Sequence, residues 1–279
     1  MFDYHIHSEF SDDSTEKIIN IVEEAIKKGG KKICFTEHKE FNYPHEKLKF
    51  NLDYDAYKKE FERIKSIYGK QIDLYMGVEI GIQAGEKNIQ EIIEYTKEHE
   101  FDFILASAHC LEGVGLYGMD PEVKDLDNLF AKYFREMLDV FKHFNDYDVV
   151  GHIDLIRRYF LEAQTHELGE SKEVLKELFA HIIQEGKGIE INTGGLFYDS
   201  ANINPTLDII KFYREMGGTI ITVGSDSHIA ERVLSNYEKA MDYLKSAGFE
   251  YVTTFEKRKK TLHKIKKNKS MQKKKLVLE

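Results

Sequence analysis

Histidine and carboxylate residues recur at the ends of short apolar runs in this chain. The first run carries His5 and His7, two positions apart. Because alternate side chains of a strand point to the same face, both imidazoles could bind one metal ion. Apolar runs also end at the following residues: His38, Glu79, His109, His152, and the pair Asp226 and His228. Imidazole and carboxylate gathered in one place predict a transition-metal site.

Each of these residues has a plainer interpretation when it is taken alone. A single His-x-His pair can be two hydrogen-bonded core histidines. Burying six histidines without a common purpose is costly, however, and a lone buried carboxylate such as Glu79 is costlier still. The loop after His7 offers Asp12 and Asp13 as further candidate ligands, although at least one of them could instead favour the start of the next helix. Glu37 is expected to point to the face opposite His38.

The candidate ligands are too many for one coordination shell, so the sequence predicts two or three divalent ions. Clustered divalent ions suit the transfer of a phosphoryl group to water. No glycine-rich phosphate loop is present. Phosphate would therefore be bound by the ions together with Arg157 or Arg158, just beyond His152. Neighbouring side chains tend to point apart, and Arg158 is the one favoured. The acidic loop 120–127 is a candidate for binding a substrate ammonium group.

The elements that position these residues alternate in type along the chain. Helical spacing of apolar residues is expected over 15–28, 54–68, 88–98, 126–144, 172–185, 206–215 and 231–247, with Ser14 or Thr15 capping the first helix. Helices of this length between strands force parallel pairing. Seven strand–helix units predict a closed or nearly closed α/β barrel, one unit short of the eightfold barrel, with the site at the C-terminal ends of the strands.

Length and composition limit the classes of protein to which the chain could belong. The chain has 279 residues, enough for one large domain or two small ones, and 42% of them are hydrophobic. No run is long and apolar enough for a membrane helix, and residues 1–20 do not resemble a signal peptide, so no membrane partner is expected. Cys34 and Cys110 are the two cysteines. A disulfide framework is therefore not expected, and a cytoplasmic location is.

Charge is distributed unevenly along the chain. The formal net charge is -9, yet residues 257–275 contain eleven Lys and Arg and no acidic residue. We expect one domain over 1–255 and a basic C-terminal tail over 256–279, as a frayed helix or disordered extension. Such a tail could contact nucleic-acid phosphates in a metal-binding module. The strongly acidic body argues against this, and no nucleic-acid partner is expected.

Together these motifs resemble the polymerase-and-histidinol-phosphatase (PHP) superfamily. The resemblance covers nearly all of residues 1–250, and its motifs are Asp3-Tyr4-His5-Ile6-His7-Ser8, Thr36-Glu37-His38, Gly77-Val78-Glu79, Ser107-Ala108-His109, Gly151-His152-Ile153-Asp154 and Gly224-Ser225-Asp226-Ser227-His228. The stretch from Glu190 to Leu196 is similar to that of the monofunctional histidinol-phosphatase branch. The family commonly has Asp at the position of Glu37, and the branch often has a basic residue at that of Phe197.

The resemblance implies a distorted seven-stranded (β/α) barrel with three zinc, manganese or iron ions. One ion would be held by His5, His7, Glu79 and Asp226; a second by Glu79, His109 and His152; the third by Asp12, His38 and His228. Glu79 would bridge two ions, and His228, Asp226 or a metal-bound water could protonate the leaving group.

The implied activity is hydrolysis of the small metabolite L-histidinol phosphate in histidine biosynthesis. The residues expected to contact the substrate are Arg158, Arg157, Tyr117 and Asn192. Another small phosphate ester or a nucleotide is the alternative substrate within the same fold.

Overall fold

Seven parallel strands form the central sheet of the computed structural model, which describes residues 1–119, 124–160, 162–197 and 202–266. In spatial order they are β1 (Phe2–Asp3), β2 (Lys32–Lys39), β3 (Asp73–Gly81), β4 (Phe103–Ser107), β7 (Val149–Val150), β8 (Gly188–Asn192) and β9 (Ile221–Gly224). Spatial order follows chain order, and every neighbouring pair is parallel. All C-terminal strand ends therefore lie at one end of the sheet.

The first and last strands of this sheet also meet. The amide of Tyr4 donates to the carbonyl of Val223, and the amide of Asp226 donates to the carbonyl of His5, both at 2.8 Å. A parallel bridge joins Ile6 to Ser227 just beyond these contacts. The sheet is thus a nearly closed barrel, which confirms the predicted seven-stranded (β/α) architecture.

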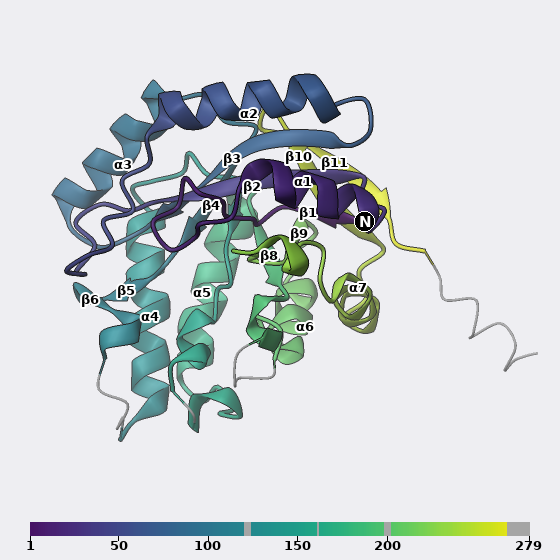
Figure 1. Cartoon of the computed structure of the whole chain (residues 1–279). Coiled ribbons are helices and arrows are strands. Elements are labelled where there is room, and N and C mark those ends of the chain that lie inside the picture. The colour runs from purple at the N-terminus through teal and green to yellow at the C-terminus, as the bar shows by residue number, and fades with distance from the viewer. Residues whose placement is uncertain (120–123, 161, 198–201, 267–279) are drawn as a thin grey trace, which may run out of the picture.

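Seven helices lie around the outside of the strands (Figure 1). They are α1 (Ile18–Lys27), α2 (Tyr54–Tyr68), α3 (Glu86–Glu98), α4 (Leu126–Phe141), α5 (Ser171–Gln184), α6 (Leu207–Glu215) and α7 (Tyr237–Ser246). Short 3₁₀ turns cover Leu116–Gly118, Leu155–Arg158, Glu162–Gln164, Gly194–Phe197 and Ala230–Arg232. A small antiparallel ribbon pairs β5 (Cys110–Leu111) with β6 (Val114–Gly115).

Two helix starts differ by three residues or more from the sequence-based expectation. The first helix begins at Ile18, whose amide donates to the carboxylate of Glu9 at 2.8 Å, so neither Ser14 nor Thr15 caps it. The last helix begins six residues later than expected. A 3₁₀ turn and two left-handed residues, Leu234 and Asn236, precede it.

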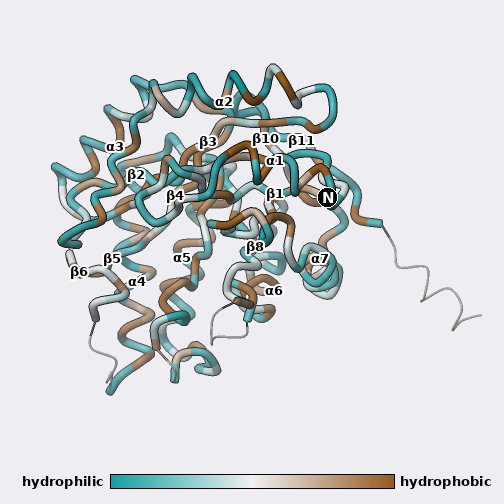
Figure 2. Tube along the Cα trace, viewed as in Figure 1, coloured by the Kyte–Doolittle hydropathy of each residue, from teal (hydrophilic) through white to brown (hydrophobic). Residues whose placement is uncertain are grey.

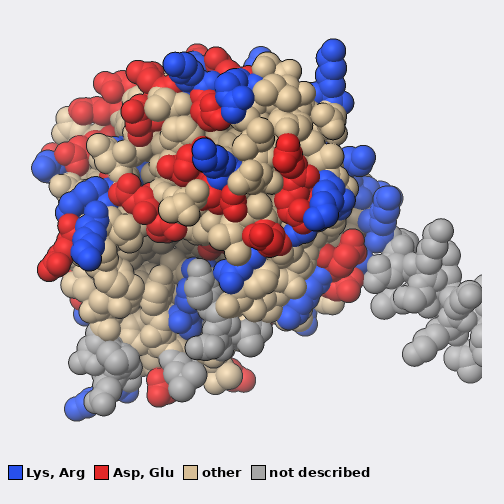
Figure 3. All heavy atoms as spheres, viewed as in Figure 1, with Lys and Arg blue, Asp and Glu red and all other residues tan. Residues whose placement is uncertain are grey.

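The core follows from strands buried on both faces. All five residues of β4 and all five of β8 are buried. Outward side chains of such strands pack under the helices and inward ones fill the barrel, as is typical of parallel sheets. Hydrophobic segments accordingly run through the strands and the inner sides of the helices (Figure 2). Acidic and basic side chains are interspersed over the face shown in Figure 3.

Regular secondary structure continues beyond residue 255. Strands β10 (Tyr251–Glu256) and β11 (Lys259–Lys264) pair as an antiparallel hairpin across the predicted boundary, so the expectation of a frayed helix or disordered extension from 256 is wrong for the described part. The guanidinium of Arg258 contacts the carboxylates of Asp148 at 2.6 Å and Asp146 at 3.1 Å. Ile265 is buried. These contacts attach the hairpin to the barrel, where β7 begins.

Both cysteines, Cys34 and Cys110, are buried and free. Within the described ranges, none of the helices is both long and apolar enough to cross a membrane.

Candidate metal centre

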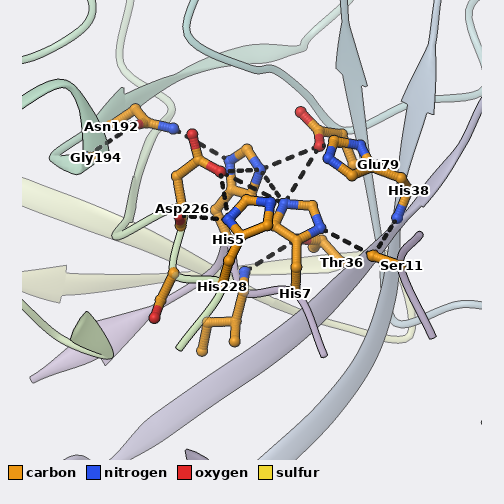
Figure 4. Close-up of polar contacts among 12 residues, drawn as sticks. His5, His7, Ser11, Thr36, His38, Glu79, Asn192, Gly194, Asp226 and His228 are labelled. Carbon is orange, nitrogen blue, oxygen red and sulfur yellow. Dashed lines mark hydrogen bonds and ion pairs between the residues drawn. The ribbon is translucent and has the colours of Figure 1, made fainter. Parts of the chain in front are cut away.

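Six histidines converge at the C-terminal end of the barrel. They are His5 and His7 beyond β1, His38 in β2, His109 beyond β4, His152 beyond β7, and His228 beyond β9. Parallel strands bring their C-terminal ends to one end of the barrel, which places these side chains together. Figure 4 shows the rings of His5, His7, His38 and His228 grouped with the carboxylates of Glu79 and Asp226.

Glu79 lies at the centre of this group and has no exposed surface. One carboxylate oxygen, Oε2, lies 2.9 Å from His38 Nδ1, 3.3 Å from His5 Nε2 and 3.4 Å from His7 Nε2. The other, Oε1, lies 3.0 Å from His152 Nε2 and 3.4 Å from His109 Nε2. A single carboxylate therefore faces five imidazoles, with its two oxygens directed at different subsets.

Asp226 adds a second carboxylate to the group. Its Oδ1 lies 3.6 Å from His5 Nε2 and 3.5 Å from His7 Nε2. The residue has a φ of 53°, in the left-handed region that residues other than glycine seldom adopt. This conformation lets the chain turn directly after β9 and still present both Asp226 and His228 to the cluster.

The loop after β1 contributes Asp13 rather than the expected Asp12. Asp13 Oδ2 lies 3.1 Å from His228 Nε2 and 3.5 Å from His38 Nε2. The carboxylate of Asp12 instead accepts the backbone amides of Lys49 and Phe50, each at 2.7 Å. Asp12 thus fastens a neighbouring loop, and the expectation that it faces the cluster is wrong.

Burial and neighbouring charges shift the pKa values of the cluster residues. Burial opposes ionisation of Glu79 and Asp226, but the neighbouring imidazoles lower the pKa of both carboxyls well below the usual range. Burial also lowers the pKa of His7 to about 3, helped by the neighbouring His38 and His228. The carboxylates are therefore ionised and His7 is neutral, which are the forms that bind metals.

The donor set fits divalent metal ions. Four overlapping groups of three side chains each bring their ligand atoms within 4.8 Å of one another: His7, His38 and His228; His5, His152 and Asp226; His5, His7 and Glu79; His38, Glu79 and His109. Nε2 of His5 lies 3.0 Å from Nε2 of His7, and Oε2 of Glu79 is buried without a hydrogen-bond donor among the described residues. Nitrogen and carboxylate donors converging in this way can hold zinc, manganese or iron.

Buried acids and two serines surround the cluster, and the sequence did not single them out as site residues. Glu190 Oε1 lies 2.7 Å from His5 Nδ1, and Glu40 Oε1 lies 2.5 Å from His109 Nδ1. Glu37, expected to point away, accepts hydrogen bonds from Ser8 and from Ser11. An acid inside an apolar strand, as in Ile-Glu-Ile of β8, was the available signal for Glu190.

A pocket of about 350 Å³ opens over the cluster. Besides Asp13, Asp226 and four of the histidines, its wall is formed by Glu40, Tyr43, Phe50, Leu155, Arg158 and Tyr159. The candidate ligands thus border a space large enough for a small metabolite, with one arginine and three aromatic rings around it.

The two neighbouring arginines point apart. Arg158 lines the pocket, and its Nη2 lies 3.2 Å from Asp226 Oδ2. Arg157 is buried away from the pocket, where its guanidinium donates to the carbonyl of His166 at 2.9 Å and its Nε lies 3.1 Å from Asp154 Oδ2. Arg157 holds the following loop, and the expectation that it contacts substrate is wrong.

Asn192 and Tyr117, which were also expected to contact substrate, do not line the pocket. Asn192 is fully buried behind His5, where its amide group donates to Glu190 at 3.2 Å and accepts the amide of Gly194 at 2.9 Å. Tyr117 is 47% exposed, and its hydroxyl donates to the carbonyl of Pro44 at 3.0 Å. Both side chains are engaged in holding backbone segments near the site.

Phe197 occupies the position where a basic residue was expected from the resemblance. The guanidinium of Arg232 lies over its exposed ring, 4.6 Å from the ring centroid. Arg232 belongs to the 3₁₀ turn that follows His228. A positive charge is therefore present next to this position, although residue 197 itself does not supply it.

This barrel and its histidine–carboxylate cluster define a class of protein. The family model described as the PHP domain matches residues 3–194, and the chain belongs to that family.

Two curated relatives resemble the chain over nearly its whole length. The histidinol-phosphatase of Lactococcus lactis subsp. lactis (strain IL1403) is 34% identical over 256 residues, which are 91% of this chain and 93% of that protein. A probable histidinol-phosphatase of Clostridium acetobutylicum is 34% identical over 266 residues, which are 92% of this chain and 98% of that protein.

One solved structure is similar in both sequence and fold. It is a histidinol phosphate phosphatase from Lactococcus lactis subsp. lactis Il1403, complexed with zinc, L-histidinol and phosphate. Its TM-score is 0.83 at 31% identity, covering 93% of this chain and 98% of that chain.

Proposed function

We propose that this protein is a metal-dependent phosphomonoesterase that hydrolyses L-histidinol phosphate to L-histidinol and phosphate, a step of histidine biosynthesis. The observation that carries the proposal is the nine-residue set of imidazoles and carboxylates at the floor of a pocket that also holds Arg158. Full-length similarity to histidinol-phosphatases supports the choice of substrate.

The ligand set supports two to three divalent ions, of zinc, manganese or iron. Glu79 is suited to bridge, because its two oxygens face different histidines. His38, His228 and Asp13 lie together at the mouth of the pocket and would form the outermost site. When bound, such ions activate water, hold phosphate oxygens and offset charge on the leaving group.

The remaining polar residues of the pocket have distinct tasks. Arg158 faces the cluster and would donate charge-assisted hydrogen bonds to phosphate. The pKa of Asp226 is lowered by its neighbours, so it stays ionised and serves as a ligand. Despite its burial, the neighbouring Asp13 and Asp226 raise the pKa of His228. In the metal-free protein this favours the protonated form of His228, and a metal ion would displace that proton on binding.

The organic part of the substrate would lie against the aromatic wall. The rings of Tyr43, Phe50 and Tyr159 border the pocket and could face a cationic ammonium or imidazole group. Two acidic residues of the loop proposed for this task have other partners. Asp125 caps α4 and Asp127 binds Ser171, whereas Asp120 and Glu122 lie outside the described residues.

Steady-state kinetics on a small panel of phosphate esters test the substrate. The panel contains L-histidinol phosphate, a simple alkyl phosphate and a 3′-phosphorylated nucleotide, with metal analysis of the same sample. We expect the highest kcat/KM for L-histidinol phosphate. The Glu79→Gln variant, purified identically, shows whether a contaminating phosphatase contributes.

A higher kcat/KM for the nucleotide or the alkyl phosphate would favour the alternative substrate within the same fold. Salt-sensitive binding to DNA without hydrolysis of any ester would favour the nucleic-acid module. A cytoplasmic location stays a prediction, which fractionation of cells that express the protein would check.

A further inference from the structure

We propose that Glu40 and Glu190 are positioning residues, each of which fixes the tautomer and ring orientation of one ligand histidine. Gly81 contributes to this arrangement, because its lack of a side chain leaves the space that the Glu40 carboxylate occupies. The inference rests on the proposed metal centre and concerns residues that have not been assigned a role in it.

The contact between Glu40 and His109 has the geometry for this role. Glu40 follows β2, and its side chain is 2% exposed. Its Oε1 lies 2.5 Å from Nδ1 of His109, while Nε2 of the same ring lies 3.4 Å from Glu79 Oε1. One ring nitrogen thus faces the supporting carboxylate and the other faces the centre of the cluster.

Glu190 repeats this arrangement on the other side of the barrel. Its Oε1 lies 2.7 Å from Nδ1 of His5, whose Nε2 lies 3.3 Å from Glu79 Oε2. The second oxygen of Glu190 accepts the backbone amide of His152 at 2.9 Å and the side-chain amide of Asn192 at 3.2 Å. Glu190 therefore orients one ligand histidine and fastens the backbone of another.

The physical reason lies in hydrogen-bond polarity. A carboxylate oxygen that accepts a hydrogen bond from Nδ1 requires this nitrogen to carry the proton. The lone pair of a neutral ring is then on Nε2, which in both histidines faces Glu79. Such outer contacts fix the tautomer of ligand histidines, and losing one typically costs about 10- to 100-fold in metal affinity or activity.

Two glycines provide the space for these acids. The register of β2 and β3 pairs Lys39 with Ile80, which brings Glu40 beside Gly81. A Cβ at Gly81 would lie 1.7 Å from Glu40 Oε2, and its three nearest atoms all belong to the Glu40 carboxylate. A Cβ at Gly224 would lie 2.1 Å from Glu190 Oε1, but it would also meet Cβ of His5. Gly81 is therefore the cleaner site for an experiment.

Zinc affinity of the purified protein, measured by competition with a chromophoric chelator, tests the role of Glu40 without any substrate. We expect Glu40→Ala to weaken the affinity of the most affected site by about 10- to 100-fold. Glu40→Gln keeps an acceptor oxygen and should fall between Glu40→Ala and the wild type. Nitrogen-15 spectra of the metal-free protein, recorded in alkaline solution where the ring is neutral, should show one fixed tautomer for His109 in the wild type and a mixture in Glu40→Ala.

Gly81→Ala makes an independent perturbation of the same contact. The added methyl group displaces the Glu40 carboxylate, so the variant should lose zinc affinity about as Glu40→Ala does. In the double variant Glu40→Ala/Gly81→Ala the methyl group has room. We therefore expect the double variant to be no weaker than Glu40→Ala alone, a strongly non-additive result.

Asp148→Asn is the matched control, because it alters a buried carboxylate at the opposite end of β7. It should lower thermal stability and leave zinc affinity unchanged. Unchanged zinc affinity and an unchanged His109 tautomer in Glu40→Ala would overturn the inference, as would additive losses in the double variant. Normal zinc binding without hydrolysis of L-histidinol phosphate would overturn only the proposed substrate.

Discussion

At the scale of single residues, Glu79 carries more contacts within the metal centre than its neighbours do. We expect Glu79→Gln to lower kcat by several orders of magnitude with the fold intact, since an amide bridges two ions poorly and removes the central negative charge of the cluster. Kinetics with circular dichroism of the same sample check this. Glu98→Gln, on the exposed end of α3, is the control. A loss of only a few-fold would rule out the bridging role.

Arg158 and Arg157 make a natural pair of variants because only one of them lines the pocket. Losing a charge-assisted contact to phosphate costs about 1.5–3 kcal/mol, so Arg158→Ala should lower kcat/KM roughly 10- to 100-fold. Arg157→Ala should instead lower the melting temperature, because Arg157 is bonded to Asp154 and to the loop carbonyl of His166. Kinetics and thermal melts of both variants distinguish the two roles. Wild-type kcat/KM in Arg158→Ala would place phosphate recognition elsewhere.

At the scale of elements, the hairpin of β10 and β11 is expected to contribute to the stability of the fold. Deleting residues 257–279 removes β11 and leaves the buried carboxylate of Asp148 without its arginine. We therefore expect this truncation to lower the melting temperature clearly. Deletion of 267–279 keeps both strands and is the matched control. Equal melting temperatures for the two truncated proteins would contradict a structural role of the hairpin.

Arg258 isolates one contact of this hairpin. Its guanidinium is about a quarter exposed, which weakens the ion pair, while Asp148 is 8% exposed. Removing the partner of a nearly buried charge should cost about 2 kcal/mol in the free energy of unfolding after allowance for solvent screening. Denaturant unfolding of Arg258→Ala measures this. The kcat should stay unchanged, because the residue lies at the opposite end of the barrel from the histidines.

At the scale of the whole molecule, the size of the ligand cluster leads to a prediction about metal content. The number of ligands in the cluster leads us to expect at least two divalent ions per purified chain. Elemental analysis alongside activity, before and after dialysis against a chelator, checks this. Activity should disappear with the metal and return when it is added back. A stoichiometry near zero in fully active protein would contradict the proposal.

The metal-free protein should respond to pH differently from the loaded one. Although burial opposes protonation, Glu79 and Glu40 raise the pKa of His109 to about 9, and carboxylates likewise raise the pKa of His38. A raised histidine pKa gives stability that is complete below about pH 6.5 and is lost as pH rises through about 9. Metal ions compete with those protons and bind better as pH rises.

The melting temperature of metal-free protein should therefore fall between pH 6 and 9, and its difference from the zinc-loaded protein should widen. Scanning calorimetry of both forms over this range is the measurement. A constant difference would mean that the histidines of the metal-free cluster are not protonated in the folded state.

Sequence alone determined the parallel barrel and the six histidines with Glu79 and Asp226. Each of these rests on a local pattern: an apolar run, a polar residue at its end, and a helix that forces the next strand to run parallel. Because the C-terminal ends of such strands meet, residues far apart in the chain could be placed together without knowledge of any contact.

Only the tertiary structure decided which neighbouring residues face the site. The choice of Asp13 over Asp12 depends on the path of a loop, which no periodicity describes. The Glu40 carboxylate fits beside Gly81 because of the way in which β2 and β3 are aligned. The hairpin at the C-terminus is fixed by the pairing of Arg258 with acids far away in sequence. Long-range contacts of this kind leave no trace in local spacing, and for that reason the sequence did not reveal them.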